Sequence, residues 1–575
     1  MYATVNASTK PITMLTFDAI VIGSGISGGW SAKELCEKGL KTLVLERGRN
    51  IEHIKDYPTA SRHPWELEHR GTVPKAYTDA NPISSKAWLF DEGSAHFFIN
   101  DDEHPYVQKK PFDWIRGYQV GGKSLTWGRA SNRWSDNEFK APERFGYGIS
   151  WPIGYDDIAP WYSHVEKFSG ICGGTDGVAS MPDGDYLPPF PLNCVEQHMQ
   201  KTLALQFPDR KMAAGRWAHL SEPQAIHLEQ GRGKCQCRNL CVRGCPLGGY
   251  FSSVASTLPW AQKTGNLTIR PHAVVHSIVY EDTLQRATGV RIIDTQSKKE
   301  EIIAARLVFV NASALNTNLI LLNSTSARFP NGLGNDSGVL GKYICFHNYR
   351  PSTWATIDGF DDVYVDGRVP SGPIMPNFKN FGQRNAAFLG GYMTFMGAFR
   401  PKRANVPNTE PQLGAAFKHR MSEPGPWRVY MYMQGETLPK ATNRVSLSSS
   451  KKDPWGIPQL VTDISYDEND ELMIQDFHEE SRKMMEALGC KNIEHVDNKQ
   501  NPGLDIHEMG GVRMGKDPTT SMLNGYNQLH ACKNVFVTDG ACMSSTGNQS
   551  PSILYMALSA RAADYAAEQI KNGNL

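Results

Sequence analysis

The stretch from Phe17 to Gly48 reads FDAIVIGSGISGGWSAKELCEKGLKTLVLERG, and it decides the fold of this chain. An apolar run leads into the turn Gly23-Ser-Gly-Ile-Ser-Gly28, a helix-compatible segment follows, and a second apolar run ends at Glu46. Strand, glycine turn, helix and strand therefore occur in order within about 30 residues, the length of one βαβ unit. The alternative is an ordinary glycine-rich turn between a strand and a helix, without a ligand.

Each glycine of this turn has a physical role in binding a dinucleotide. Gly23 permits the tight turn, Gly25 lets the backbone approach a pyrophosphate, and Gly28 lets the helix pack closely on the strand. The free N–H groups and the macrodipole at the helix N-terminus favour the negative charge of the diphosphate. Glu46, 18 positions after Gly28, is placed to accept hydrogen bonds from a ribose. The stretch therefore predicts a dinucleotide site without identifying the dinucleotide.

The composition excludes several classes of partner. The 575 residues include 60 basic and 59 acidic side chains, so no nucleic-acid or anionic-membrane partner is indicated. No apolar run approaches 18 residues, and we expect no membrane span. Residues 1–16 lack a charged segment followed by an apolar core, so they predict no secretory signal. A cytoplasmic location is expected, or a periplasmic one if a signal-bearing partner subunit carries the chain across.

Strand-like segments occur in groups along the chain. Residues 267–310 alternate as strands and end in a buried strand that leads into an apolar helix, as in a Rossmann unit. Residues 346 to about 465 mix strand-like runs with turns, as in a separate sheet domain, and residues 466–489 have helical periodicity. Near the end, residues 534–540 predict another buried strand, and Ser552 to Ile570 predict a long helix.

This order of elements predicts an α/β fold with an α+β second domain. A Rossmann-like nucleotide-binding domain, residues 1–345 and 500–575, is built from both ends of the chain. A β-sheet substrate domain, residues 346–499, is inserted between its two parts. Two segments of the first domain, about 50–112 and 170–230, are expected to be loop or lid insertions. The discontinuity argues against an NAD-dependent dehydrogenase with tandem domains.

Further blocks make the chain similar to a known family. Together with the N-terminal stretch, they resemble the glucose–methanol–choline (GMC) oxidoreductases, which bind FAD. The resemblance is strongest to the bacterial sugar dehydrogenase and pyranose oxidase branch, which includes glucoside 3-dehydrogenases. It extends from Phe17 to Tyr565 and covers nearly the whole chain. The blocks are RGYQVGGKSLTWGRASNRW (116–134), WPIGYDDIAPWYSHVEKFSG (151–170), LVFVNASALNTNLILLNSTS (307–326), HEMGGVRMGKDPTTSMLNGYNQLHACKNVFVTDGACM (507–543) and SPSILYMALSARAADY (550–565).

The resemblance implies that the dinucleotide is FAD. The segment VGGKS (120–124) puts two glycines where a backbone passes close to a flat ring such as isoalloxazine, although a tight turn without a ligand would look the same. Pyranose oxidase-like members join a histidine of this loop covalently to the flavin, and Thr126 matches that position, so non-covalent FAD is expected. Asp539 matches the family's second FAD-contacting segment and can also cap the following turn. The residues expected to bind FAD are Gly23, Gly25, Ile26, Ser27, Gly28, Glu46, Arg47, Gly121, Gly122, Ser124, Val275, Asp539 and Gly540.

His507 is the predicted catalytic base. It matches the family's active-site histidine, and imidazole, with a pKa of about 6.5, suits removal of a hydroxyl proton while hydride passes to flavin N5. The family's second polar residue is usually Asn or His before the proline of the last helix, and direct register places Ser550 there, before Pro551. Ser550 could bind the substrate oxygen, or Asn548 could reach in. The structural alternative makes Ser550 the N-cap and Pro551 the first helical residue.

Four cysteines within 11 residues, Cys235, Cys237, Cys241 and Cys245, form a second candidate site. Their thiolates can converge on one soft metal centre. Cytochrome-linked sugar dehydrogenases that the chain resembles carry a three-iron cluster on a similar stretch, so an iron–sulfur cluster is predicted. Structural zinc and plain buried thiols are the alternatives. A cluster would pass electrons from the flavin to an external acceptor, such as a small or cytochrome subunit.

These inferences predict an FAD-dependent enzyme that oxidises a secondary or anomeric hydroxyl of a sugar or glycoside. The product is a keto-sugar, with C3 favoured, or a lactone, and the electrons go to an external acceptor. Three alternatives stay open. The first is a pyranose oxidase-like enzyme that uses O₂, and the second is an NAD-dependent dehydrogenase, which a yellow purified protein would reject. The third is a non-catalytic flavoprotein, such as a redox sensor or assembly subunit.

Overall fold

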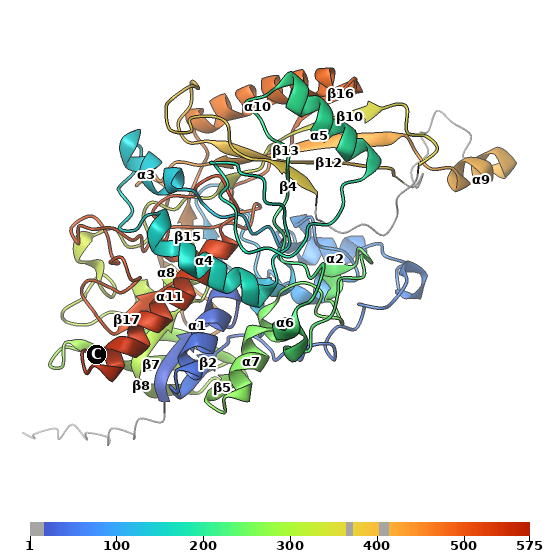
Figure 1. Cartoon of the computed structure of the whole chain (residues 1–575). Coiled ribbons are helices and arrows are strands. Elements are labelled where there is room, and N and C mark those ends of the chain that lie inside the picture. The colour runs from blue at the N-terminus through green and yellow to red at the C-terminus, as the bar shows by residue number, and fades with distance from the viewer. Residues whose placement is uncertain (1–16, 364–371, 402–412) are drawn as a thin grey trace, which may run out of the picture.

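The computed structural model describes residues 17–363, 372–401 and 413–575. Two large sheets lie one above the other, and helices flank both (Figure 1). None of the helices in these three ranges is long and apolar enough to span a bilayer.

The lower sheet in Figure 1 grows from the glycine-turn stretch. Strand β1 pairs in parallel with β2 on one side and β8 on the other, and β8 pairs in parallel with β17 near the C-terminus. Both ends of the chain therefore contribute to one sheet, and its central strands are buried on both faces, as parallel strands usually are. In spatial order the strands are β5 (Leu267–Arg270), β2 (Thr42–Leu45), β1 (Phe17–Ile22), β8 (Glu300–Val310), β7 (Arg286–Asp294) and β6 (Ala273–Glu281), with β17 (Val535–Val537) also beside β8.

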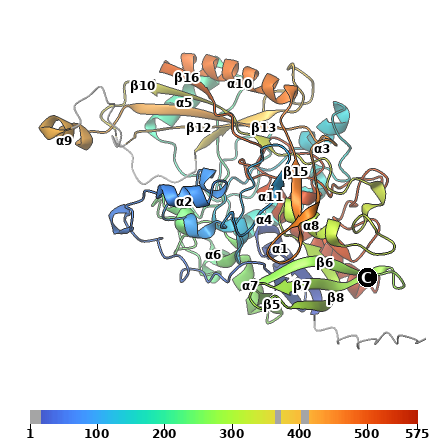
Figure 2. The same cartoon turned by 180° about the vertical axis from the view of Figure 1, so that it is seen from behind.

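Strand β8 links this parallel sheet to an antiparallel layer. Residues 300–304 of β8 pair with β7, whereas residues 305–310 pair with β1. The layer β6–β7–β8 lies toward the viewer in Figure 2.

Helices α1 (Ile26–Glu37) and α11 (Ser552–Lys571) pack together against the parallel strands. Small side chains such as Ala32 and Ala563 let them approach closely over Phe309 and Phe536. The predicted last helix is confirmed. The other helices of this body are α2 (Lys75–Ala80), α3 (Asp136–Arg144), α4 (Tyr155–Ser169), α6 (Ala225–Glu229), α7 (Thr257–Lys263) and α8 (Ala314–Asn323).

The upper sheet is antiparallel, and one of its faces packs on two helices through a methionine-rich core. The helices are α10 (Glu468–Ala487), which confirms the predicted helix, and α5 (Cys194–Gln206). A three-stranded sheet, β14 (Arg444–Lys452), β15 (Pro458–Asp463) and β3 (Val107–Gln108), lies apart from it, as does α9 (Gly414–Ser422). The upper strands are, in order, β16 (Lys491–Asp497), β10 (Pro351–Ile357), β13 (Trp427–Glu436), β12 (Tyr392–Phe399), β11 (Pro373–Met375) and β4 (Ala213–Ala214), with β9 (His347–Asn348) beside β13.

The segment 170–230 differs from the predicted loop or lid insertion of the nucleotide-binding domain. It supplies α5 and β4, and β4 pairs with β11 in the upper sheet. Val195, Met199 and Leu203 of α5 are fully buried in the core of that sheet. The apolar stripe of α5 therefore packs residues 194–206 of this segment on the upper sheet. Residues 50–112, by contrast, consist mainly of loops and short helices, as predicted.

Candidate active site

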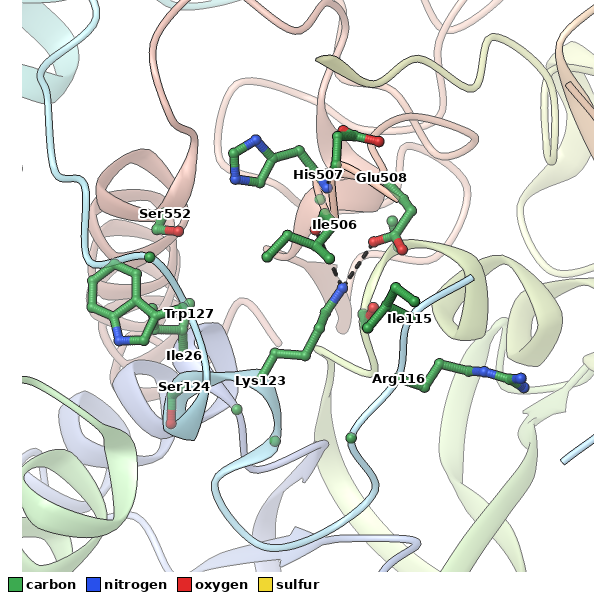
Figure 3. A pocket seen from close by; sticks show the side chains of 18 of the residues that line it. Ile26, Ile115, Arg116, Lys123, Ser124, Trp127, Ile506, His507, Glu508 and Ser552 are labelled. Carbon is green, nitrogen blue, oxygen red and sulfur yellow. Dashed lines mark hydrogen bonds and ion pairs between the residues drawn. The ribbon is translucent and has the colours of Figure 1, made fainter. Parts of the chain in front are cut away.

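A cavity of about 840 Å³ lies between the two large sheets. This volume is in the upper part of the range of about 300–1,000 Å³ typical of ligand and cofactor sites. The glycine turn and the loop 115–130 line one part, residues 504–508 line another, and aromatic side chains of the upper sheet complete the wall. Figure 3 shows the region where the first two meet.

The glycines of the turn have the geometry that a bound diphosphate requires. Gly23 has a φ of 97°, and a Cβ there would lie 2.2 Å from the carbonyl oxygen of Asn311. A Cβ at Gly28 would lie 1.9 Å from the oxygen of Gly23, so helix and strand meet at backbone distance. A Cβ at Gly25 would project into open space. The cavity is therefore open where Gly25 faces it, and the N-terminus of α1 points there.

Glu46 lines the cavity at the end of β2 and is held by the turn itself. Its carboxylate accepts a 2.6 Å hydrogen bond from Ser24 Oγ and a 3.1 Å bond from the Gly48 N–H. Burial raises the pKa of Glu46, and these hydrogen bonds oppose the rise. The Ser24 N–H also donates to Oε2 at 3.3 Å, so Oε1 is the oxygen that keeps a lone pair for a ribose hydroxyl.

A second glycine pair comes close to the first turn. Gly121 and Gly122 have φ values of 96° and 48°, and the Gly121 N–H donates to Ser24 Oγ at 3.0 Å. A Cβ at Gly122 would lie 3.4 Å from the Cα of Gly25, so the two backbones lie side by side, nearly in contact, and form one wall of the cavity. We call this wall the glycine slot, because a dinucleotide can lie along it close to the backbone N–H groups.

The structure brings most of the predicted FAD-binding residues to one cavity. Gly28 and Gly121 do not line it but shape the backbone behind it. The Asp539 carboxylate accepts from Thr317 Oγ1 at 2.6 Å and from the Ala541 N–H at 3.0 Å, so it caps the following turn while lining the cavity. The lining residues among those predicted are Gly23, Gly25, Ile26, Ser27, Glu46, Arg47, Gly122, Ser124, Val275, Asp539 and Gly540.

His507 lines the same cavity beyond the glycine slot. In Figure 3 its ring points away from Lys123 and Glu508, toward the side where Trp127 and Ser552 lie. Burial, then the neighbouring His347 and Lys123, lower the pKa of His507 well below its ordinary value. The ring is therefore neutral near pH 7 and able to accept a proton.

A second histidine, which the sequence did not reveal, stands behind His507. His347 of β9 is fully buried, and its Nδ1 lies 2.9 Å from Nδ1 of His507. Its Nε2 lies 2.9 Å from the carbonyl oxygen of Gly547. The Asp505 carboxylate accepts hydrogen bonds from the backbone N–H groups of both histidines, at 2.9 Å and 3.2 Å. The two rings are therefore held together by their backbones as well as by their nitrogens.

Ser550 lies in the cavity wall, but not as a helix cap. Pro551 is the N-cap of α11 and no side chain caps it, so the structural alternative for Ser550 is wrong. Its hydroxyl donates to Oε1 of Gln434 at 2.9 Å, an oxygen that also accepts a hydrogen bond from the Tyr349 hydroxyl. Gln434 in turn donates to the carbonyl oxygen of Asn548 at 2.7 Å.

Asn548 does not reach the cavity. Its amide nitrogen donates to Oε1 of Glu138 at 3.0 Å in the buried layer behind the loop. The prediction that Asn548 partners His507 is therefore wrong in this structure. The chain turns at Gly547, with a φ of 57°, and this turn directs the Asn548 side chain inward.

Lys123 and Glu508 form an ion pair inside the cavity (Figure 3). Lys123 Nζ lies 2.9 Å from Oε2 of Glu508 and 3.3 Å from the carbonyl oxygen of Ile506. The sequence pattern identified the glycines beside Lys123 but assigned the lysine no role. The pair ties the 120–124 loop to the segment that carries His507.

The upper sheet presents an aromatic wall to the cavity. Register places Trp354 opposite Tyr430 and Phe395 opposite Tyr432, so these rings form adjacent cross-strand pairs. Such rings supply rigid apolar contact area. Sequence reasoning missed the wall because only strand register shows which aromatics share a face. It consists of Tyr349, Trp354, Phe395, Phe399, Tyr430 and Tyr432.

The four clustered cysteines lie outside the cavity lining, near Arg129, which does line it. Arg129 is fully buried, and its Nη2 donates to the carbonyl oxygen of Cys241 at 3.0 Å. No described residue hydrogen-bonds to its Nε and Nη1. No three of the four sulfur atoms, all within the described residues, lie within 4.8 Å of one another, whereas a tetrahedral zinc site needs sulfurs at about 3.8 Å. The cysteines as arranged here do not fit structural zinc.

Comparison with known proteins agrees with this geometry. The chain is 25% identical to the fructose dehydrogenase large subunit of Gluconobacter japonicus, over 97% of this chain and 99% of that one. It is also 25% identical to paromamine 6'-oxidase of Streptomyces fradiae, over 96% of this chain and 91% of that one. The formate oxidase of Aspergillus oryzae shares the fold, with a TM-score of 0.61 and 15% identity over 98% of this chain and 100% of that one.

Family models described as GMC oxidoreductase match residues 17–348 and 439–559, more than half of the chain. The predicted family, the α/β fold class and an oxidoreductase that acts on CH–OH groups are thereby confirmed. The glycine slot fits FAD, the cofactor of this family. The chain belongs to the GMC oxidoreductase family.

Proposed function

We propose that the protein oxidises a secondary or anomeric hydroxyl of a sugar or glycoside, giving a keto-sugar, with C3 favoured, or a lactone. One observation carries this proposal. The neutral ring of His507 opens onto a cavity that has a dinucleotide slot on one side and an aromatic wall on the other.

His507 is the proton acceptor in this reaction. Its Nε2 has no hydrogen-bond partner among the described residues, and the ring faces the cavity. It takes the hydroxyl proton as the C–H bond breaks, and general-base catalysis of this kind contributes about 10²–10⁴ to a rate. Ser550 offers an oxygen lone pair to the substrate because its hydrogen is directed at Gln434. When bound, FAD supplies the acceptor of the electron pair, at flavin N5.

The aromatic wall supports a sugar-like substrate. The apolar C–H face of a pyranose or furanose packs on aromatic rings such as Trp354 and Tyr430, and its hydroxyls then point toward the polar end of the cavity. Two relatives are named for sugar-containing substrates, fructose and paromamine. We infer a body for FAD, made from both chain ends, and a substrate body made from the upper sheet with α5 and α10.

FAD is held without a covalent bond in this proposal. The loop from Val120 to Ala130 contains no histidine, cysteine or tyrosine, and Thr126 itself does not line the cavity. Retention then depends on the glycine slot and Glu46.

We further propose that Cys235, Cys237, Cys241 and Cys245 hold an iron–sulfur cluster, which would carry electrons singly from the flavin to an external acceptor. Buried donors that lack partners among the described residues support an anionic group here: Nε and Nη1 of Arg129 and Nη2 of Arg232. Burial, with the other three thiols nearby, raises the pKa of Cys235 to about 12, so a bound metal is needed to keep it a thiolate.

The acceptor in this scheme is a small or cytochrome subunit, consistent with a relative that is named as a large subunit. The enzyme then works in the cytoplasm, or in the periplasm if that subunit carries the export signal. An O₂-using oxidase is the second candidate, because another relative is named as an oxidase.

The test uses the purified holoprotein with an artificial electron acceptor and a panel of glucosides and free sugars. We expect turnover with one sugar class and, by NMR, a single oxidised carbon, with C3 favoured. Fast reoxidation of the reduced flavin by air, without added acceptor, would identify the oxidase instead. A flavin that no sugar or glycoside reduces would refute the proposal.

A further inference from the structure

The hydrogen bonds around His347 determine which nitrogen of His507 carries a proton. The carbonyl oxygen of Gly547 can only accept, so Nε2 of His347, 2.9 Å away, must carry a hydrogen. A neutral imidazole carries one hydrogen, and Nδ1 of His347 is therefore an acceptor. The 2.9 Å contact between the two Nδ1 atoms then requires that His507 donates its Nδ1–H. Nε2 of His507 is left without a hydrogen.

We propose that His347 is a positioning residue, which holds His507 in the Nδ1–H tautomer and so presents its bare Nε2 to the substrate hydroxyl. The inference rests on the proposed function, because it gives His507 the role of base. His347 belongs to β9 in the substrate body, whereas His507 belongs to the FAD body. A residue of one body therefore orients the base of the other.

Burial supports the neutral state of His347 on which this chain of hydrogen bonds depends. His347 is fully enclosed, and burial lowers its pKa to about 4, while the Gly547 and Thr546 carbonyls oppose the shift. At neutral pH it therefore carries one proton. After His507 takes a proton on Nε2, its Nδ1–H still has the His347 nitrogen as an acceptor, so the imidazolium keeps its orientation.

Asp505 supports the arrangement from the backbone. Its carboxylate accepts from the N–H groups of His347, His507 and Gly503, at 2.9, 3.2 and 3.1 Å. Three such bonds fix the spacing of the two histidine backbones. The rings cross at 80° with their centroids 5.0 Å apart, which leaves the two Nδ1 atoms as the point of contact.

Several charged or titratable groups surround His507 and contribute to any pH effect. They are His347, Lys123, Glu508, Asp505 and Tyr349. None of them except His347 contacts a ring nitrogen of His507. Changes at position 347 therefore test the tautomer, while the other groups stay constant.

The test compares His347→Gln, His347→Phe and His347→Glu with the wild type. Glutamine can donate to Gly547 and accept from His507 Nδ1–H, as His347 does. Phenylalanine can do neither, so kcat should fall about 10- to 100-fold, as for other groups that orient a reacting residue, with KM little changed. Glutamine should restore most of that loss. Glutamate places a negative charge beside His507, so the acidic limb of the pH–rate profile should move to higher pH.

His227→Gln is the matched control, because this buried histidine also has both ring nitrogens hydrogen-bonded but lies outside the cavity. FAD content and thermal stability are measured for every variant. If His347→Phe folds with FAD and keeps the wild-type kcat, the proposal is overturned. It is also overturned if His347→Gln folds but loses as much activity as His347→Phe, or if the Glu variant leaves the profile unmoved.

Should the Phe variant not fold, the Gln and Glu variants decide together. A wild-type-like kcat for His347→Gln with a shifted acidic limb for His347→Glu supports the proposal, and a 100-fold loss in the Gln variant with FAD retained, or an unmoved profile in the Glu variant, opposes it. Failure of the proposed function looks different. In that case no sugar reduces the flavin of the wild type. If only the present inference fails, the wild type is active and the variants at position 347 have the same kcat and pH–rate profile as the wild type.

Discussion

Three polar groups in the cavity wall, Ser550, Tyr349 and His507, each present a lone pair. Ser550 and Tyr349 both direct their hydrogens at one oxygen of Gln434, so each presents oxygen lone pairs elsewhere. Nε2 of His507 carries no hydrogen, because Nδ1 of His507 donates to His347, which in turn donates to the Gly547 carbonyl oxygen. A substrate hydroxyl therefore meets acceptors, and its proton has one basic site within reach.

Replacing His507 by alanine should lower kcat by about 10²–10⁴, the usual share of a general base. The measurement is the anaerobic rate at which substrate bleaches the flavin, with FAD content as the control for folding.

Because the pKa of His507 is well below 6.5, the imidazole stays neutral as the pH falls through that value. The wild-type rate should therefore hold through pH 6.5 and decline only in more acidic solution. A midpoint at or above 6.5 would contradict this assignment.

At the scale of elements, the two glycines at the start of helix α1 have opposite surroundings. Gly28 lies at backbone distance from Gly23, whereas Gly25 faces open space. Helix packing therefore requires glycine at position 28, whereas at position 25 only a bound ligand would require it.

Substitution of these two glycines should separate folding from cofactor binding. Gly28→Ala forces a Cβ to 1.9 Å from the oxygen of Gly23 and should destabilise the fold by about 1–3 kcal/mol or more. Gly25→Ala places its methyl group in the cavity, at a φ of −69° that alanine adopts freely, so stability should be retained and FAD affinity should fall. Thermal unfolding and FAD titration of the apoprotein measure the two effects. Equal stability losses would refute the distinction.

Helix α1 is also tied to α4 through a buried carboxylate. Glu34 Oε1 lies 2.9 Å from Lys33 Nζ and 2.7 Å from Nε2 of His164. Burial alone would raise the pKa of Glu34, but His164 and Lys33 outweigh it and lower the pKa from 4.5 to about 2. A depressed carboxyl pKa stabilises the fold above pH 4.5, and this contribution is lost as the pH falls from there toward 2.

Glu34→Gln should therefore lower the free energy of unfolding at pH 7 by roughly 3 kcal/mol, since each unit of pKa shift corresponds to about 1.4 kcal/mol. The difference from the wild type should shrink steadily as the pH is lowered toward 2. Urea denaturation at several pH values measures both. Glu37→Gln is the control, because Glu37 shares Lys33 but is 35% exposed in its side chain, and it should change stability much less. A loss independent of pH would point to packing instead.

At the scale of the whole molecule, the cavity forms where segments far apart in sequence meet. The nucleotide slot comes from residues near both ends, the aromatic wall from the middle, and Arg129 joins the cavity to the cysteine cluster. This arrangement is the one that the proposed transfer of electrons from the flavin to the cysteine cluster requires.

Cys241→Ser should reduce the bound iron and slow electron transfer to an external acceptor, while leaving the reduction of flavin by substrate unchanged. Iron analysis, EPR and stopped-flow absorbance distinguish these steps. Cys490→Ser, at a half-buried cysteine outside the cluster, is the control and should change neither quantity. Wild-type protein without iron would exclude the cluster.

Local patterns were sufficient to predict the elements with strong periodicity. The glycine turn, the strand before Asp539 and helices α10 and α11 each carry their signal within about 20 residues. Helix α5 was missed as part of the substrate body, because its partner strands lie more than 140 positions away in the sequence. His347 was missed for a related reason: β9 has two residues, and only its pairing with β13 places the ring behind His507.

The His347–His507 contact joins the two bodies through the proposed catalytic base. His347 arrives with the upper sheet, whereas His507 precedes a segment that packs into the FAD body. If the two bodies separate, Nδ1 of His507 loses its contact with His347, so its hydrogen is no longer directed by a fixed acceptor. Under the proposed mechanism, the reactive tautomer is therefore selected only when the upper sheet is docked on the FAD body.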